Sequence, residues 1–558
     1  MSSNDRLRIG LLVDGPALAA WAWSMVDILR RSEYAQIVLI VRASTSGSAA
    51  EYSPGDAGRN AAGPGRRGVL DKLLDGAERW LVGKPGALPD ASAMKDATEL
   101  FSGIETIAMP APGGESSEAM AQAIAAHRCD VLVQLNQFAL SSDLLGSARF
   151  GVWRFEFGDR ALNGDAPAGY REVMESHPVC AAVLRSIARD ENYSGVLCRS
   201  FSSTQAMSLH DNANSMQWKA LHFAPRKLKQ LQSSGSVSFF QGMDEPVTLP
   251  VFSTWPRAGM PERGERAQLL FRKFFEKFRR KWNEVAYLKQ WYLLCDLDNE
   301  SSGEIGRYKA LIPPKDRIWA DPFVIARDGR YFIFIEEMSF AGRKGHISLI
   351  EMAADGSWKL PIKIIEEPFH LSYPFVFEFE GQWYMIPETR GHSTVSLYKC
   401  TAFPDQWTFD KHLLEDCQAV DATLTQWKGK WWLFANQVQS RGASLWDELF
   451  VYYSDSPIST QWKSHPLNPV VSDVRSARPA GRMFERDGRL YRPSQNSSGH
   501  YGYGLNICEV TMLSETDYEE RIVQAITPDW SRDVIATHTY NHANGLTVID
   551  AQLRRWKW

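Results

Sequence analysis

Ionisable and hydrogen-bonding residues recur at one position of a pattern that repeats through the second half of the chain. In three copies this residue lies eight positions before a glycine, from 321 to 329, 373 to 381 and 421 to 429, and in two copies it lies ten and seven positions before one. Carboxylates placed in this way could transfer protons as general acids and bases, while the other side chains hold a polar substrate. The five residues are Asp321, Tyr373, Asp421, Arg478 and His538.

The glycines themselves define the repeat. Each is followed by aromatic or apolar residues and, in four copies, by a polar residue seven positions later: Glu336, Glu388, Asn436 and Gln495. The glycines are Gly329, Gly381, Gly429, Gly488 and, in a weaker copy, Gly545. A strand-like unit with a period near 50 residues is typical of propeller blades. We therefore expect an all-β five-bladed propeller over residues 290–558, with each glycine in a hairpin turn, where a positive φ costs it little.

In a propeller the first strand of each blade lines the central axis, so equivalent residues form a ring at the mouth of the channel. The return strands should bring Glu336 or Glu337, Glu388 and Gln495 to the same face, and Arg492 beside Arg478. Ion pairs with only a structural role would rarely recur at the same position of every repeat. We therefore favour the interpretation that the ring of equivalent residues is functional. If Arg478 and Arg492 pair only with carboxylates, however, they are structural.

The first half of the chain predicts a different fold class. Apolar runs at Leu7–Val13 and Ile37–Val41 flank a helix-like segment, Ala17–Arg30, and further strand-like runs follow at residues 130–135 and 151–157. This order indicates an α/β domain with a mostly parallel sheet, which we place at residues 1–231.

Residues 232–289 are expected to form a linker that contains a basic amphipathic helix. Over residues 266–282 aromatic side chains recur at helical spacing, and Lys and Arg fill most of the other positions. Such a helix packs between domains or, alternatively, makes peripheral contact with an anionic membrane surface.

Composition narrows the function classes. The 558 residues carry a formal charge of −4, which argues against nucleic acid as a general partner. The seven cysteines are scattered and lack CxxC spacing, so we expect neither a metal site nor disulfides, and nothing in the chain predicts a cofactor. Residues 1–8 do not look like a signal peptide, and no apolar run is long enough to span a bilayer. We expect a cytoplasmic protein, with membrane association as an open alternative.

Several longer motifs of the second half resemble known carbohydrate-active propellers. The Asp-Pro-Phe and Tyr-Pro-Phe openings resemble five-bladed glycosidases of the arabinanase, levansucrase and invertase superfamily. A fuller set of motifs resembles the N-terminal domain of plant glucosamine inositolphosphorylceramide transferases and its bacterial relatives; these motifs are residues 319–324 (WADPFV), 370–378 (HLSYPFVFE), 384–389 (YMIPET), 477–481 (ARPAG) and 490–495 (LYRPSQ).

The resemblance implies roles for the ring. Asp321 matches the general base of the glycosidases, and Asp421 could match the second Asp, although it lies one blade later than expected. Arg478 stands at the blade-four position that the resemblance implies for the acid, and arginine does not donate a proton near neutral pH, so Glu388 is the candidate acid. The predicted substrate-binding residues are Trp319, Glu337, Tyr373, Arg478, Arg492, Gln495 and His538. Alternatively, Arg478, Arg492 and His538 bind an anionic group such as phosphate or uronate.

The first half resembles, more distantly, the fold of methionyl-tRNA and sugar N-formyltransferases. Formyl transfer in that family needs an Asn, a His and an Asp, and the matched positions hold Arg154, Glu156 and Tyr193. The resemblance therefore implies a formyltransferase-like scaffold that has lost formyl transfer. A remodelled site that uses Glu156 and Asp159 is the alternative.

Together these observations predict a glycosidase-like or glycosyl-transferring protein of cell-surface polysaccharide or glycolipid metabolism. Its partner would be an oligosaccharide, a glycolipid or a nucleotide sugar. The rival hypothesis is a non-catalytic glycan-binding propeller fused to an inactive formyltransferase-like domain.

Overall fold

A computed structural model describes residues 6–43, 69–83, 86, 88–109, 117–136, 141–158, 163, 166–241, 260–297, 305–440 and 442–558. The chain forms two compact units, Met1–Lys277 with Ser440–Ala443, and Phe278–Gln439 with Ser444–Trp558. The division falls inside helix α11 (Arg263–Ala286), which contains the helix expected over residues 266–282. The domain boundaries at 231 and 289 stay predictions.

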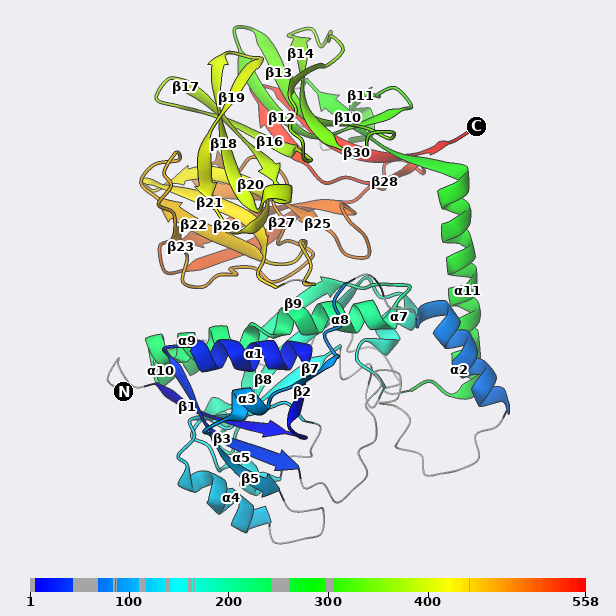
Figure 1. Cartoon of the computed structure of the whole chain (residues 1–558). Coiled ribbons are helices and arrows are strands. Elements are labelled where there is room, and N and C mark those ends of the chain that lie inside the picture. The colour runs from blue at the N-terminus through cyan, green and yellow to red at the C-terminus, as the bar shows by residue number, and fades with distance from the viewer. Residues whose placement is uncertain are drawn as a thin grey trace. The chain divides into compact units, whose positions relative to one another are not determined.

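The first unit is an α/β domain built on a seven-stranded sheet in the order β5-β3-β1-β6-β7-β8-β9 (Figure 1). The first five of these strands run parallel to one another, β8 pairs antiparallel with β7, and β9 pairs antiparallel with β8, which confirms a mostly parallel sheet. The strands are β1 (Leu7–Val13), β3 (Ala35–Ala43), β5 (Glu105–Met109), β6 (Val131–Gln134), β7 (Val152–Phe157), β8 (Val179–Ile187) and β9 (Gly195–Ser203).

Apolar side chains cover both faces of this sheet. Helices α1 (Ala20–Arg31), α8 (Leu209–Ala220), α9 (Phe223–Ser234) and α10 (Ser236–Gln241) pack on one face, and α4 (Ser117–Ala126) and α5 (Ser142–Leu145) pack on the other. The helix expected from residue 17 begins at Ala20, because Ala17–Ala19 form a short strand, β2, that pairs with β4 (Met94–Asp96). The remaining helices are α2 (Val69–Val82), α3 (Thr98–Phe101) and α7 (Tyr170–Glu175), with a 3₁₀ turn at Glu191–Tyr193.

The second unit is a five-bladed β-propeller, as expected (Figure 1). The first four blades are antiparallel four-stranded sheets in chain order. Blade 1 is β12 (Arg317–Arg327), β13 (Arg330–Ser339), β14 (Gly345–Ala353) and β15 (Ile362–Ile365), and blade 2 is β16 (Ser372–Phe379), β17 (Gln382–Thr389), β18 (Thr394–Ala402) and β19 (Gln406–Leu414). Blade 3 is β20 (Gln418–Trp427), β21 (Lys430–Val438), β22 (Leu449–Ser454) and β23 (Lys463–Ser464), and blade 4 is β24 (Phe484–Arg486), β25 (Arg489–Asn496), β26 (Gly504–Leu513) and β27 (Tyr518–Ile526).

Blade 5 joins two distant parts of the chain. Its strands β10 (Tyr287–Asp296) and β11 (Lys309–Leu311) precede blade 1, whereas β28 (Val534–Ala536), β29 (Tyr540–Ala543) and β30 (Leu546–Trp556) follow blade 4. Strands β10 and β30 pair antiparallel over ten residue pairs. This pairing closes the ring of blades.

The five predicted hairpin turns are present. At every turn the glycine has a φ between 70° and 88°, and the residue before it has a φ between 43° and 53°. Two consecutive positive φ angles define the type I′ turn that fits the twist of paired strands. The residue pairs are Asp328–Gly329, Glu380–Gly381, Lys428–Gly429, Asp487–Gly488 and Asn544–Gly545.

The inner strands of the first three blades share a backbone irregularity. The pairing register skips between Ala320 and Phe323, between Ser372 and Phe375, and between Val420 and Thr423. Inside each skip lies a residue in the left-handed conformation: Asp321, Tyr373 or Asp421, with φ of 50°, 46° and 53°. Bulges of this kind re-aim a side chain, and strained non-glycine backbone is concentrated at functional sites.

Candidate functional site

A cavity of about 540 Å³ lies in the propeller unit at the inner strands of its blades. Five carboxylate or histidine side chains from blades 1, 2 and 5 and from the segment before blade 2 line it, together with an arginine at blade 4, three aromatic residues and several smaller groups. The residues used below are Asp321, Glu336, Glu388, Arg478, His538, Trp291, Trp446, Tyr501 and His370.

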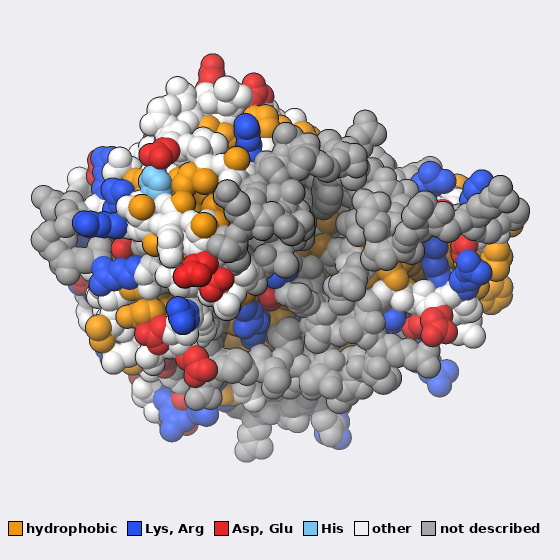
Figure 2. Space-filling model, turned by 90° about the horizontal axis from the view of Figure 1, so that it is seen from below, with side chains coloured by type: hydrophobic (Ala, Val, Ile, Leu, Met, Phe, Trp, Pro, Cys, Tyr) orange, Lys and Arg blue, Asp and Glu red, His pale blue; other side chains and the backbone are white. Residues whose placement is uncertain are grey.

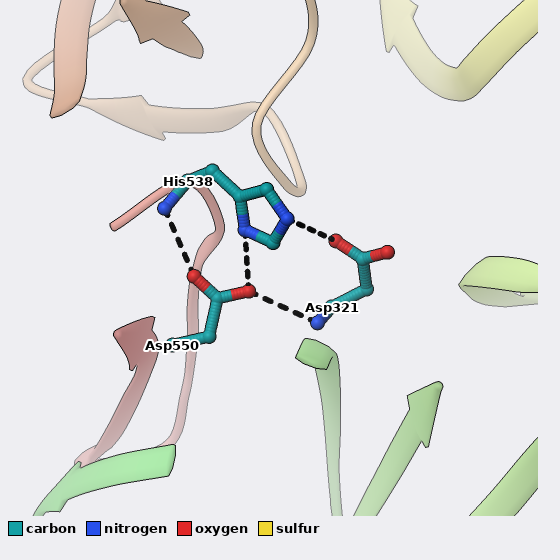
Figure 3. A group of neighbouring side chains, drawn as sticks. All are labelled: Asp321, His538 and Asp550. Carbon is teal, nitrogen blue, oxygen red and sulfur yellow. Dashed lines mark hydrogen bonds and ion pairs between the residues drawn. The ribbon is translucent and has the colours of Figure 1, made fainter. Parts of the chain in front are cut away.

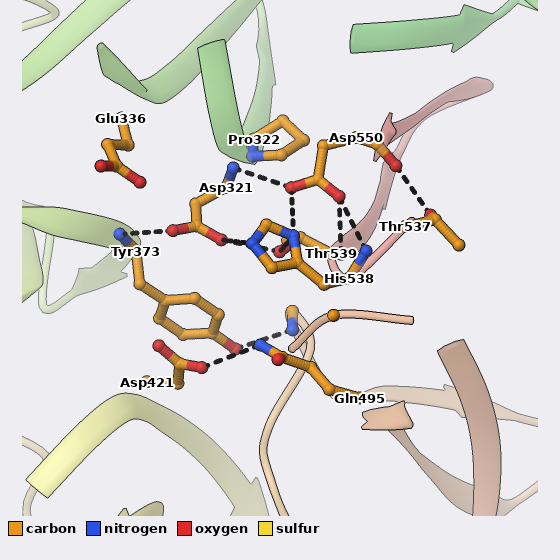
Figure 4. Close-up of polar contacts among 12 residues, drawn as sticks. Asp321, Pro322, Glu336, Tyr373, Asp421, Gln495, Thr537, His538, Thr539 and Asp550 are labelled. Atoms are coloured by element: carbon orange, nitrogen blue, oxygen red, sulfur yellow. Dashed lines mark hydrogen bonds and ion pairs between the residues drawn. The ribbon is translucent and has the colours of Figure 1, made fainter. Parts of the chain in front are cut away.

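Asp321 is held at the bulge of β12 by a closed set of hydrogen bonds (Figure 4). Its backbone N–H donates to Asp550 Oδ2 at 3.0 Å. Its carboxylate accepts from the Tyr373 backbone N–H at 3.2 Å and from the Thr539 hydroxyl at 2.8 Å. Burial raises the pKa of Asp321 to about 6; His538 acts to lower this pKa, and Asp421 and Asp550 act to raise it.

His538 lies between two carboxylates (Figure 3). Its Nδ1 is 2.6 Å from Asp550 Oδ2, and its Nε2 is 3.8 Å from Asp321 Oδ1. Burial alone would lower the pKa of His538, but Asp550 and Asp321 outweigh burial, so the pKa is raised above its ordinary value. The imidazole also stacks on Trp291, with ring centroids 4.0 Å apart and planes 12° apart.

The same three residues could in principle share a metal ion, since one ligand atom from each of Asp321, His538 and Asp550 lies within 4.8 Å of the others. The Asp550 carboxylate, however, already accepts from His538 Nδ1 and from the backbone N–H groups of Asp321, His538 and Thr539. An ion would have to displace the proton on Nδ1 and compete with these donors. The cluster therefore fits a protonated histidine between carboxylates better than a metal centre.

Asp421, the equivalent residue of blade 3, has a different partner. Arg478 Nε donates to its Oδ2 at 2.5 Å and a second guanidinium nitrogen donates to Oδ1 at 3.2 Å. Gln495 Nε2 donates to Oδ2 at 3.0 Å. Arg478 also lies 3.6 Å from Glu388 Oε2, and its guanidinium covers the ring of Tyr501 at 4.9 Å. A bidentate arginine of this kind fixes the position of a carboxylate.

Two glutamates of the return strands face the cavity. Burial raises the pKa of Glu388 to about 8, with Asp421 adding to the rise and Arg478 opposing it. Burial, with Asp321 and Glu388 nearby, also raises the pKa of Glu336 well above its ordinary value. Glu336 lies 3.3 Å from His370 Nε2. Near pH 7 the cavity thus holds protonated as well as ionised carboxyl groups.

Five of the predicted binding residues lie away from the cavity lining, and one of them, Gln495, donates to Asp421 instead. Tyr373 is fully buried, and its hydroxyl contacts Thr423 at 2.8 Å and accepts from the Gly481 N–H at 2.7 Å. Arg492 pairs with Glu520 through two nitrogens, at 2.8 and 2.6 Å. Glu337 accepts from Arg317, Ser348 and the Trp319 indole, which is itself buried.

Several site residues were missed by the sequence analysis. The repeat left Glu336 or Glu337 open for the ring and Glu337 was the predicted binding residue, but the cavity is lined by Glu336, which lies seven positions after its glycine, as Glu388 does. Trp291, Trp446, Tyr501, His370 and Asp550 fall outside the repeat phase, so nothing in the pattern pointed to them.

The α/β unit places its matched residues in separate surroundings. Glu156 lies 3.5 Å from Arg185 on the neighbouring strand, and Tyr193 packs against Phe150 and Phe240. Asp159 lies outside the described residues. Loss of formyl transfer stays a prediction.

Two solved structures align with part of this chain at low similarity. A family 117 glycoside hydrolase, Zg3597 of Zobellia galactanivorans, aligns with 48% of this chain and 90% of its own, at 13% identity and a TM-score of 0.31. Glycinamide ribonucleotide transformylase 1 of Symbiobacterium toebii aligns with 42% of this chain and 90% of its own, at 10% identity and a TM-score of 0.28.

Two plant proteins are similar in sequence to part of this chain. "Glucosamine inositolphosphorylceramide transferase 1" of Oryza sativa subsp. japonica is 36% identical over 204 residues, which are 36% of this chain and 27% of the rice protein. The protein of the same name from Arabidopsis thaliana is 34% identical over 204 residues, 26% of its length. This chain therefore spans only about a quarter of the curated relatives it matches. Residues 313–547, which contain every cavity residue named above except Trp291, match the family described as "Glucosamine inositolphosphorylceramide transferase 1, N-terminal".

Proposed function

We propose that the propeller cavity binds a sugar and catalyses cleavage or transfer at a glycosidic bond. The observation that carries this proposal is that two carboxyl groups with different pKa values line one cavity. The pKa of Asp321 is near 6 and that of Glu388 is near 8. At pH 7 Asp321 is mainly ionised and Glu388 mainly protonated. Two carboxyl groups whose environments separate their pKa values suit a base and an acid.

In this mechanism Glu388 donates its proton to the oxygen of the leaving group. Asp321 accepts a proton from the attacking hydroxyl, which belongs to water in hydrolysis and to an acceptor in transfer. His538 and Asp550 fix the position of Asp321 through its backbone and carboxylate. Trp291, Trp446 and Tyr501 line the cavity with aromatic side chains, and Arg478 can bond to a hydroxyl or an anionic substituent of the sugar.

The substrate class is proposed from the relatives. Their name refers to glucosamine and to a phosphorylated ceramide lipid, so we infer that a glycolipid, or an oligosaccharide or nucleotide sugar used in making one, occupies the cavity. Cytoplasmic location with peripheral membrane contact through residues 266–282 would bring the cavity to such a substrate.

The rival proposal is a binding module without turnover. Its support is that Arg478, which stands where the glycosidases suggest an acid, is already paired with Asp421 and close to Glu388. In that case the charged ring fixes the cavity and recognises sugar without chemistry.

A turnover assay on glycosides, glycolipids and nucleotide sugars separates the two. We expect Asp321→Asn and Glu388→Gln each to lower kcat by about 10²–10⁴-fold while calorimetry still detects binding. Activity should require pH above about 6 and below about 8, because Asp321 must be ionised and Glu388 protonated. The control variant is Glu337→Gln, because Glu337 lies in the same blade as Asp321 but does not line the cavity. Sugar binding without turnover in the wild type would establish the binding module instead.

A further inference from the structure

Helix α11 carries an exposed apolar stripe along its length. Six side chains on it are each between 46% and 64% exposed: Phe271, Phe274, Phe275, Phe278, Trp282 and Val285. Their spacing of three or four residues places them on one face of the helix. Scattered apolar residues are ordinary on a protein surface, but a contiguous aromatic patch marks a site of interaction.

Helix α2 extends this surface within the first unit. Leu70, Leu73 and Trp80 are each more than half exposed. Trp80 lies beside Phe274, with ring centroids 6.4 Å apart, and Lys277 Nζ lies 4.4 Å above its ring.

Buried contacts on the other side fix α2 against α11. Arg266 donates to Asp75 at 2.8 Å and to Glu78 at 2.7 Å. Leu74 and Leu81 pack in one cluster with Leu269 and Leu270. The apolar side chains are thus held outward on a two-helix support, so their exposure does not come from fraying.

Basic side chains border the stripe. At about 100° per residue, Arg272 and Arg279 fall on one flank and Lys277 and Lys281 on the other. Residues 266–282 contain seven basic residues and one acidic residue, in a chain whose formal charge is −4. Figure 2 shows hydrophobic side chains beside Lys and Arg side chains at its right-hand edge, the side on which Figure 1 draws α2 and α11.

We propose that this surface binds the interface of an anionic lipid membrane, with α11 lying in the membrane plane. Aromatic side chains would enter the boundary between headgroups and acyl chains, and the flanking Lys and Arg would reach the phosphates. Because the side chains on both flanks are positively charged, they favour an anionic membrane surface over a protein partner. No described helix is both long and apolar enough to cross a membrane. This proposal rests on α2 and α11 alone and does not depend on the chemistry of the cavity.

Vesicle flotation of the full chain tests it. Vesicles of phosphatidylcholine with phosphatidylglycerol should carry the protein upward, and those of phosphatidylcholine alone should carry much less. Phe275→Ser/Phe278→Ser/Trp282→Ser should lower the bound fraction at least about tenfold, because it removes much of the inserting apolar area. The matched control is Leu360→Ser/Ile362→Ser/Ile522→Ser, which changes exposed apolar residues of the propeller and should bind as the wild type does.

A charge variant makes the test independent of the aromatic residues. Arg279→Glu/Lys281→Glu should lose preference for the anionic vesicles, whereas Lys315→Glu/Lys399→Glu, also on the exposed surface, should keep it. Binding should weaken as salt rises. Equal flotation of the serine variant and the wild type, or none with anionic vesicles, would overturn the proposal. The proposal would also be overturned if the wild-type protein were a dimer and Phe275→Ser/Phe278→Ser/Trp282→Ser made it a monomer without changing its flotation. The stripe would then join two copies of the chain.

Discussion

Asp321 and Asp421 occupy the same position in the hairpins of blades 1 and 3, yet their surroundings differ. Both lie in a bulged inner strand with a left-handed backbone, and both are buried. Asp321 faces a histidine, a threonine hydroxyl and a backbone N–H, whereas Asp421 is clamped by the guanidinium of Arg478 and the amide of Gln495. The position in the repeat decides where a carboxylate lies, and its neighbours decide which groups bind it.

The first prediction concerns stability and has the largest expected effect. Arg478→Met leaves Asp421 as a buried carboxylate without its guanidinium partner, and removing one member of a buried ion pair costs about 3–5 kcal/mol. His538→Asn should cost less, about 1–2 kcal/mol, because Asp550 keeps three backbone donors. Urea unfolding of the propeller measures both.

A second substitution checks the cause. Asp421→Asn added to Arg478→Met removes the unpaired charge, so the double variant should be more stable than Arg478→Met alone. If the two variants unfold alike, or if His538→Asn costs as much as Arg478→Met, the proposed contrast between the two halves of the ring is wrong.

The second prediction is a pH dependence of stability. The pKa of Glu388 is about 8 in the folded state and about 4.3 in an unfolded chain, so between these values the folded state binds more protons. The free energy of unfolding should therefore fall as pH rises through this window, by roughly 3–4 kcal/mol between pH 5 and 8. Unfolding of Glu388→Gln from pH 5 to 8 should lack this part of the decline.

Glu337 provides the control, because its pKa moves the other way. Burial acts to raise it, but hydrogen bonds from His346, Ser348 and Arg317 lower it to about 2. Its contribution to stability is present above the unfolded pKa and is lost only as pH falls toward 2. Glu337→Gln should leave the slope between pH 5 and 8 unchanged; if it flattens that slope as Glu388→Gln does, the assignment to Glu388 fails.

The smallest predicted effect concerns two single hydrogen bonds, one to Asp321 and one to Asp421. Thr539→Val removes a donor to Asp321 and should raise the pKa of Asp321 further, by about half a unit to one unit. Gln495→Leu removes a donor to Asp421 and should leave the pKa of Asp321 in place. A carbon-13 NMR titration of the Asp321 carboxyl reads both, and equal shifts would mean that the two sides are not independent.

Features with a local cause were predictable from the sequence. The hairpin glycines, the five blades and the ring positions of Asp321, Asp421, Arg478 and His538 follow from a repeat whose period reflects one supersecondary unit. The candidate acid Glu388 lies in the cavity for the same reason. The roles of these residues stay predictions.

The features of the site that could not be predicted from the sequence depend on contacts between blades and between neighbouring strands. Asp550 reaches His538 within blade 5 and Asp321 in blade 1, and no spacing rule connects these positions. Arg492 shares a strand with Gln495 but points to Glu520, because alternate side chains of a strand face opposite sides. The same alternation separates Glu336 from Glu337.

The pairing of β10 with β30 has a consequence for how the protein is made. About 250 residues separate these strands, and ribosomes add roughly 5–20 residues per second, so β10 waits about 10–50 s for its partner. During this time the nascent chain has an unpaired strand edge, which is prone to wrong pairing. The strand that ends the wait also carries Asp550, so the charge network around His538 cannot form on an incomplete chain. Polypeptides released before residue 550 would lack both the closed ring and the hydrogen bonds that hold Asp321, which makes closure of the propeller and assembly of the cavity a single event in biosynthesis.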